Sequence, residues 1–151
     1  MSRRTRLVTW VPVLIVMALI FVASSQPKHA PPPDQGRVYF SGMIPIFAGG
    51  WDALIKKSAH MIAYGALAVL ILRALLAHGL SSREATVAAI LLTVAYALTD
   101  ELHQAFVMGR SSSVLDIGFD YVGAAASCLI ARHLPAWLNK TSPSARGDRS
   151  P

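Results

Sequence analysis

The chain has 151 residues, of which 54% are hydrophobic and only 15% are charged, and its formal net charge is +6. This composition is too apolar and too unevenly charged for an ordinary soluble domain, so one small integral membrane domain is expected. Nucleic-acid binding is not expected, because the basic residues flank apolar runs, as membrane orientation requires, and form no patch interleaved with aromatic residues. The single cysteine, Cys128, excludes an intrachain disulfide.

The first apolar segment follows a basic N-terminus, residues 1–6, that we expect to lie in the cytoplasm. The segment runs from Leu7 to Ala23, which is long enough to cross a bilayer with modest local thinning. A cleaved signal peptide is the competing interpretation, because the basic stretch, the apolar run and the small residues Ala23 and Ser25 fit that pattern. The length of the apolar run favours a retained membrane anchor.

The next part of the chain, residues 24–50, is rich in Pro and Gly and has no sustained period. It predicts an external loop, with a short interfacial piece around residues 38–47. A second apolar run follows Trp51, which we expect to anchor the helix at the membrane interface, and ends near Ala77.

Two further helices are predicted after this run. Ser81 and Glu84 have the spacing of a capping box, which opens a third helix expected to run to about Phe106. A fourth helix is predicted over residues 114–134, and residues 135–151 form a polar tail that is expected to be disordered.

The predicted fold is all-α, a small integral membrane bundle of about four transmembrane helices that forms one domain over residues 7–134. Its orientation follows from the basic residues beside the spans, because cytoplasmic loops carry an excess of Lys and Arg. With both termini inside, about nine basic residues lie on the inner side and about five on the outer side. The inner ones are Arg3, Arg4, Arg6, Arg73, Arg83, Arg132, Lys140, Arg146 and Arg149, and the outer ones are Lys28, Arg37, Lys56, Lys57 and Arg110.

Polar residues gather at the outer ends of the second, third and fourth predicted helices. With both termini inside, these ends of the three helices lie in one layer of the outer leaflet. Helical spacing also places the polar residues of each helix close together on one face. Ionisable groups at such a place are costly and by default suggest a functional site. The set comprises Lys57, His60 and Tyr64, then Asp100, Glu101 and Gln104, then Arg110 in the following loop, and finally Asp116 and Asp120.

The fourth helix also carries a stripe formed by Asp116, Asp120, Gly123 and Ser127. The last two residues are small, and small residues allow the backbones of two membrane helices to approach closely. We therefore expect another helix to pack against this one just below the two acids.

These polar residues carry a resemblance to a known family. The ordered motifs that resemble the VanZ-like membrane protein family are Lys57-x-x-His60-x-x-x-Tyr64, Asp100-Glu101-x-x-Gln104, Arg110 and Asp116-x-x-x-Asp120-x-x-Gly123. The resemblance covers about residues 52–130, and one departure is Asp120, where many members carry Asn. It implies a protein of the bacterial cytoplasmic membrane that is connected with the cell envelope. The family is named for a protein associated with teicoplanin resistance, which links it to glycopeptide susceptibility and antibiotic resistance.

The leading hypothesis for the polar layer is recognition of the polar end of an amphiphile. Membrane lipids are expected partners, and the amphiphile itself is expected to be a lipid-linked cell-wall precursor or a lipoglycopeptide. Lys57 and Arg110 are expected to contact its phosphate or carboxylate, since Arg offers a planar fork for bidentate contacts. The residues that would orient these cations and the ligand's hydroxyl or amide groups are Glu101, Gln104, Asp116 and Asp120.

Two other hypotheses remain open. The polar layer is also interpreted as a buried network that only sets the register of the helices. Alternatively, the protein is a membrane enzyme in which His60 and Glu101 perform acid–base chemistry on a lipid-linked substrate. No spacing in the sequence defines a metal site, and neither a metal nor another cofactor is expected. The oligomeric state is not indicated.

Overall fold

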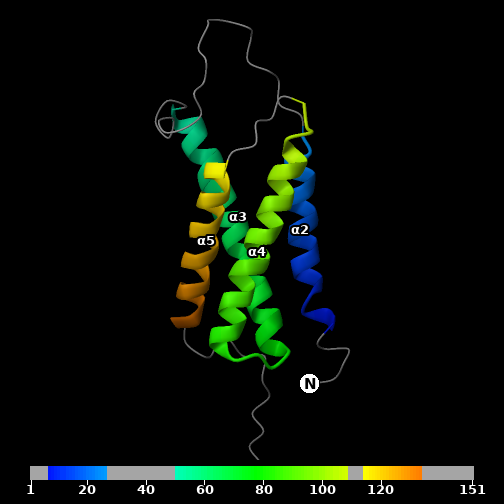
Figure 1. Cartoon of the computed structure of the whole chain (residues 1–151), viewed down its shortest axis with the longest axis vertical. Coiled ribbons are helices and arrows are strands. Elements are labelled where there is room, and N and C mark those ends of the chain that lie inside the picture. Colours follow the sequence, from blue (N-terminus) through cyan, green and yellow to red (C-terminus); the bar gives the residue numbers. More distant parts are fainter. Residues whose placement is uncertain (1–6, 27–49, 109–113, 134–151) are drawn as a thin grey trace, which may run out of the picture.

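The computed structural model describes residues 7–26, 50–108 and 114–133. These three stretches contain four helices and no strand, which confirms the prediction of an all-α fold. The helices are α2 (Val11–Ser24), α3 (Gly50–Ala77), α4 (Ser82–Gln104) and α5 (Val114–His133). Figure 1 shows them side by side with alternating directions, so that α2 and α4 end near the place where α3 and α5 begin.

The hairpin between α3 and α4 is fixed by two local motifs. At the end of α3, the N–H of Gly79 donates to the carbonyl of Leu76 and the N–H of Leu80 donates to that of Leu75. This is a Schellman motif, and its glycine has the positive φ of 95° that the motif requires. At the start of α4, Ser81 and Glu84 form the predicted capping box, with each side chain bonded to the other's backbone N–H.

Two of the four helices are long and apolar enough to cross a membrane, over Lys57–Ala77 and Ser82–Gln104. The first predicted span is shorter in the structure, because α2 has only 14 residues where a helix that crosses the bilayer usually needs about 20. A crossing by α2 or α5 thus stays a prediction, as does the number of four spans. The predictions for residues 1–6, 27–49, 109–113 and 134–151 lie outside the described residues.

Most of the core lies where α3 packs against α5 and α4. Its buried residues are mainly aliphatic or small, and the small ones allow the helix axes to come close. Core residues include Leu67, Ala68, Ile71, Ala85, Ala89, Ala97, Ala124 and Cys128, with Val13 and Ile20 added by α2. All four helices also expose large apolar side chains, such as Leu19, Ile62, Leu91 and Ile130, and helices that are apolar on the outside as well as the inside are typical of membrane proteins.

The small-residue stripe of α5 does pack against another helix, as predicted. A Cβ atom added to Gly123 would lie 2.5 Å from the carbonyl oxygen of Met61 in α3. A Cβ atom added to Gly65 of α3 would in turn collide with the hydroxyl of Ser127. The two helices therefore touch backbone to backbone directly below Asp120, which holds the polar residues of α3 and α5 close to each other.

Candidate functional site

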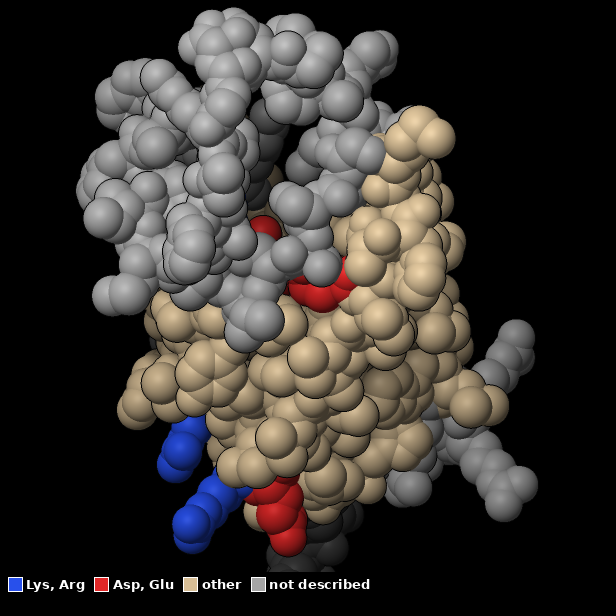
Figure 2. Space-filling model, turned by 45° about the horizontal axis from the view of Figure 1, so that its top comes forward, with Lys and Arg blue, Asp and Glu red and all other residues tan. Residues whose placement is uncertain are grey.

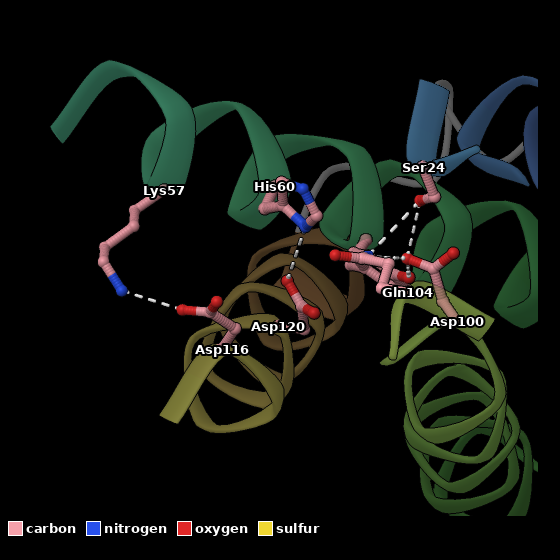
Figure 3. A network of polar contacts seen from close by, with 8 residues as sticks. Ser24, Lys57, His60, Asp100, Gln104, Asp116 and Asp120 are labelled. Carbon is pink, nitrogen blue, oxygen red and sulfur yellow. Dashed lines mark hydrogen bonds and ion pairs between the residues drawn. The ribbon is translucent and has the colours of Figure 1, made fainter. Parts of the chain in front are cut away.

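Polar side chains from all four helices meet near one end of the bundle, which is the upper end in Figure 1. The alternation of helix directions explains this, because Ser24 lies at the end of α2, Gln104 at the end of α4, and Lys57 and Asp116 near the starts of α3 and α5. Figure 3 shows these groups in series across the helices. Of the predicted set, Arg110 lies outside the described residues.

One group of these side chains is buried, and we call it the inner cluster: Ser24, Tyr64, Asp100 and Gln104. One carboxylate oxygen of Asp100, Oδ2, accepts hydrogen bonds from the hydroxyl of Ser24 at 2.8 Å, the hydroxyl of Tyr64 at 2.9 Å and the amide of Gln104 at 2.8 Å. All four residues are at most 5% exposed. The inner cluster thus ties α2, α3 and α4 together through a single acceptor atom.

A second group is partly open, and we call it the outer cluster: Lys57, His60, Asp116 and Asp120. The ammonium of Lys57 lies 2.7 Å from Oδ1 of Asp116 and 4.7 Å from the centre of the Phe119 ring. These two ion-paired side chains are 26% and 34% exposed, and that of His60 is 37% exposed. The outer cluster joins α3 to α5 and can be reached from outside the bundle.

Asp120 differs from the rest of the outer cluster because its side chain is only 2% exposed. Within the described part of the chain, its buried Oδ1 has no hydrogen-bond partner. The Nδ1 atom of His60 lies 3.9 Å from this oxygen, which is beyond hydrogen-bond distance. A buried carboxylate oxygen left in this state is costly, and in Figure 3 it points toward the imidazole ring.

Comparison with protein families shows the family to which the chain belongs. The family model VanZ/LLP1 matches residues 9–137. The chain belongs to the VanZ-like family. Searches of curated proteins and of solved structures found no match.

The VanZ-like match is longer than the resemblance drawn from the polar motifs, which covers about residues 52–130. It begins at residue 9 and so takes in α2. In the structure α2 contributes Val13 and Ile20 to the core, and the hydroxyl of Tyr96 donates to the backbone carbonyl of Met17 at 2.7 Å. The first apolar segment is therefore an integral part of the VanZ-like bundle in this structure.

The most informative residue that sequence reasoning missed is Ser24. It stands at the end of an apolar run, and its only signal in the sequence is its small polar side chain, which fits the start of the predicted loop at residues 24–50. In the structure it donates to the buried Asp100. The hydroxyl of the next residue, Ser25, lies 3.0 Å from Nε2 of His103, whose ring stacks on Phe21. The end of α2 is therefore bonded to α4 at two places.

Glu101 is also buried, at 6% exposed, on α4 beside Asp100. The sequence suggested Glu101 as the acid–base partner of His60. In the outer cluster, however, the carboxylate that faces His60 is that of Asp120. Among the described residues, no group of three or more His, Cys, Asp or Glu side chains is arranged to hold a metal ion.

Charge differs between the two ends of the bundle. The buried or half-buried acids lie at the end of the bundle that holds the two clusters. Three exposed arginines lie near the opposite end, at the α3–α4 hairpin and the end of α5, namely Arg73, Arg83 and Arg132. Figure 2 shows acidic groups in its upper half and basic groups near the lower end, where acidic atoms are also visible. This asymmetry has the form that the positive-inside rule describes.

Proposed function

We propose that this VanZ-like protein recognises the polar end of an envelope amphiphile, a cell-wall lipid precursor or a lipoglycopeptide, at the outer cluster. The observation that carries the proposal is the partial exposure of Lys57, His60 and Asp116 directly beside the buried Asp120. Polar side chains that served only to bond one another would be closed off, as those of the inner cluster are. The two clusters therefore have different roles in this proposal. The inner cluster holds the helices together, and the outer cluster binds the ligand.

The orientation of the bundle supports an outer-leaflet site. If Arg73, Arg83 and Arg132 lie on the cytoplasmic side, as the positive-inside rule favours, the opposite end of the bundle faces outward. We propose that the chain crosses the bacterial cytoplasmic membrane four times, with both termini inside. The outer cluster then opens toward the cell wall, where lipid-linked precursors and lipoglycopeptides occur.

The depth of the outer cluster suits the head group of an amphiphile better than a wholly soluble molecule. At a rise of about 1.5 Å per residue, Asp120 lies about 9 Å below the start of α5 at Val114. The site is therefore below the helix ends and beside exposed apolar side chains such as Ile62 and Val122. A ligand held there would place its polar part against the cluster and its apolar part against lipid.

The proposal predicts a binding defect without a folding defect. In lipid nanodiscs, replacing the ion pair with neutral side chains (Lys57→Met with Asp116→Asn), or replacing the imidazole (His60→Ala), should weaken binding of dye-labelled teicoplanin about tenfold or more. The reason is that a hydrogen bond to a charged group contributes about 1.5–3 kcal/mol. Fluorescence anisotropy measures the affinity, and thermal unfolding of each variant measures the stability.

The matched control for this prediction is Arg73→Met, which removes an exposed cation from the opposite end of the bundle and should leave the affinity unchanged. Equal affinity in all variants would contradict the proposal. Lower stability without a specific binding defect would instead support the structural interpretation of the layer. In cells that depend on the protein, the same variants should change glycopeptide susceptibility in the order of their binding defects.

A second candidate function is a membrane enzyme, and the arrangement of His60 favours it. The ring is 37% exposed and its Nδ1 faces the buried carboxylate of Asp120 at 3.9 Å. If this distance closes to that of a hydrogen bond when a substrate binds, the carboxylate would orient the ring for proton transfer. Glu101, the partner expected from the sequence, lies on the neighbouring helix α4. Turnover of a lipid-linked substrate by the purified protein, lost in His60→Ala with the fold retained, would establish catalysis.

A further inference from the structure

The outer cluster has more hydrogen-bond acceptors than donors. Asp116 and Asp120 are carboxylates, which in the ionised state only accept hydrogen bonds, whereas Lys57 is the single ammonium among the described groups of the cluster. With both carboxylates ionised and His60 neutral, these three side chains together carry one net negative charge. A ligand that complements the cluster must therefore bring donors.

The cation of the cluster is already engaged. The ammonium of Lys57 lies 2.7 Å from Asp116 and above the ring of Phe119. An anionic head group could reach this ammonium only by sharing it with Asp116 or by separating the pair. Sharing would place a second negative charge beside a carboxylate that is two-thirds covered, and separation would leave that carboxylate without its cation, and both are unfavourable.

Asp120 adds an acceptor that the protein does not fully use. Its carboxylate is 98% buried, and in the described part of the chain its Oδ1 makes no hydrogen bond. Figure 3 shows this carboxylate between the Lys57–Asp116 pair and the inner cluster, directed at the ring of His60. When this carboxylate is ionised, its negative charge acts on whatever occupies the exposed side of the outer cluster.

We infer that the outer cluster binds a head group that donates hydrogen bonds, and specifically the primary ammonium of an amphiphile, in preference to a phosphate or carboxylate. The inference rests on the proposed function, because it assigns a ligand chemistry to the same site. The exposed side of the Asp116 carboxylate accepts from the ammonium, and Asp120, when ionised, adds to the attraction. Lys57 is then a competitor for Asp116 and not the group that holds the ligand, which differs from the role expected for it from the sequence.

Three amphiphiles with the same twelve-carbon chain test this inference on the native protein in neutral lipid nanodiscs. Dodecylammonium carries a positive charge and N–H donors, dodecyltrimethylammonium carries the charge without the donors, and dodecyl phosphate carries a negative charge. Isothermal titration below their aggregation concentrations should give an affinity for dodecylammonium about tenfold or more above that for either of the others. Equal affinity for the two cations would overturn the requirement for a donor.

Two variants with opposite expected effects locate the binding. Lys57→Met removes the competitor and should tighten dodecylammonium binding by about threefold to tenfold, whereas Asp116→Asn should weaken it about tenfold or more. Arg73→Met is the control and should leave the affinity unchanged. Weaker dodecylammonium binding in Lys57→Met would contradict the inference.

The outcomes separate this inference from the function on which it rests. Tighter binding of dodecyl phosphate, lost in Lys57→Met, would overturn the ligand class while recognition at the outer cluster stands. The inference would also be overturned if dodecylammonium did not bind saturably. The proposed function would be contradicted as well only if the outer-cluster variants left teicoplanin binding unchanged. The comparison of the three amphiphiles needs no variant, so it decides the inference even if Asp116→Asn does not fold.

Discussion

Replacing Asp100 with alanine is expected to lower the free energy of unfolding by about 2–4 kcal/mol. The change removes the acceptor that Ser24, Tyr64 and Gln104 share and leaves three buried donors without it. Individual hydrogen bonds in membrane proteins contribute about 0.6 kcal/mol on average and rarely more than about 1.7 kcal/mol, so the large expected effect comes from losing three at once. Reversible unfolding in mixed detergent micelles measures it.

Two comparisons make the Asp100 prediction specific. Tyr64→Phe deletes a single donor and should cost about 1 kcal/mol, and its effect should largely disappear in the Asp100→Ala background because the acceptor is already gone. Asp100→Asn keeps one acceptor oxygen and should fall between these two variants. Native stability in Asp100→Ala would show that the inner cluster does not hold the helices together.

Gly123→Ala is expected to lower the free energy of unfolding by about 1–3 kcal/mol. The added methyl group would lie 2.5 Å from the carbonyl oxygen of Met61 and 3.0 Å from its Cα atom. These are backbone atoms, so they cannot turn aside as a flexible side chain could. The helices α3 and α5 must move apart, which also separates the partners of the outer cluster, and we therefore expect ligand binding to weaken together with stability.

The control for this prediction lies on the same helix. A Cβ atom at Gly118 would meet nothing within 4 Å, so Gly118→Ala should be neutral or stabilise the protein by up to about 1 kcal/mol through helix propensity. Unfolding of the two variants under identical conditions gives the comparison. If Gly123→Ala is tolerated as well as Gly118→Ala, the two helices do not approach as closely as the structure places them.

The features that the sequence predicted well depend on local interactions. The start of α4 follows from Ser81 and Glu84, which lie three residues apart and bond to each other's backbone. The small-residue stripe was also predictable, because Gly123 and Ser127 share a helix face by spacing alone. The gathering of the polar residues at one end followed from the lengths of the helices and the short hairpin at residues 78–81.

The pairing of side chains between helices was not predictable in the same way. Spacing shows that Lys57, His60 and Tyr64 lie near one another on α3, but the rotation of the neighbouring helices decides which acid each one meets. In the structure Lys57 forms an ion pair with Asp116, and the hydroxyl of Tyr64 donates to Asp100. The carboxylate of Asp120 faces His60.

The role of Ser24 could not be predicted from the sequence for a related reason. Its contact with Asp100 joins residues 76 positions apart and depends on how α2 packs against α4. No local pattern distinguishes a serine that caps a buried carboxylate from one that begins a loop or follows a cleavage site. The first apolar segment could be placed in the bundle only after its packing was known.

Recognition of an envelope amphiphile requires that the outer cluster open to the exterior of the cell. Labelling of substituted cysteines in intact cells with a membrane-impermeant thiol reagent tests it directly, and the native Cys128 is fully buried and should add little background. Lys57→Cys should be labelled in intact cells, whereas Arg83→Cys, at the opposite end of the bundle, should be labelled only after the membrane is permeabilised. Labelling of Arg83→Cys but not of Lys57→Cys in intact cells would contradict the account.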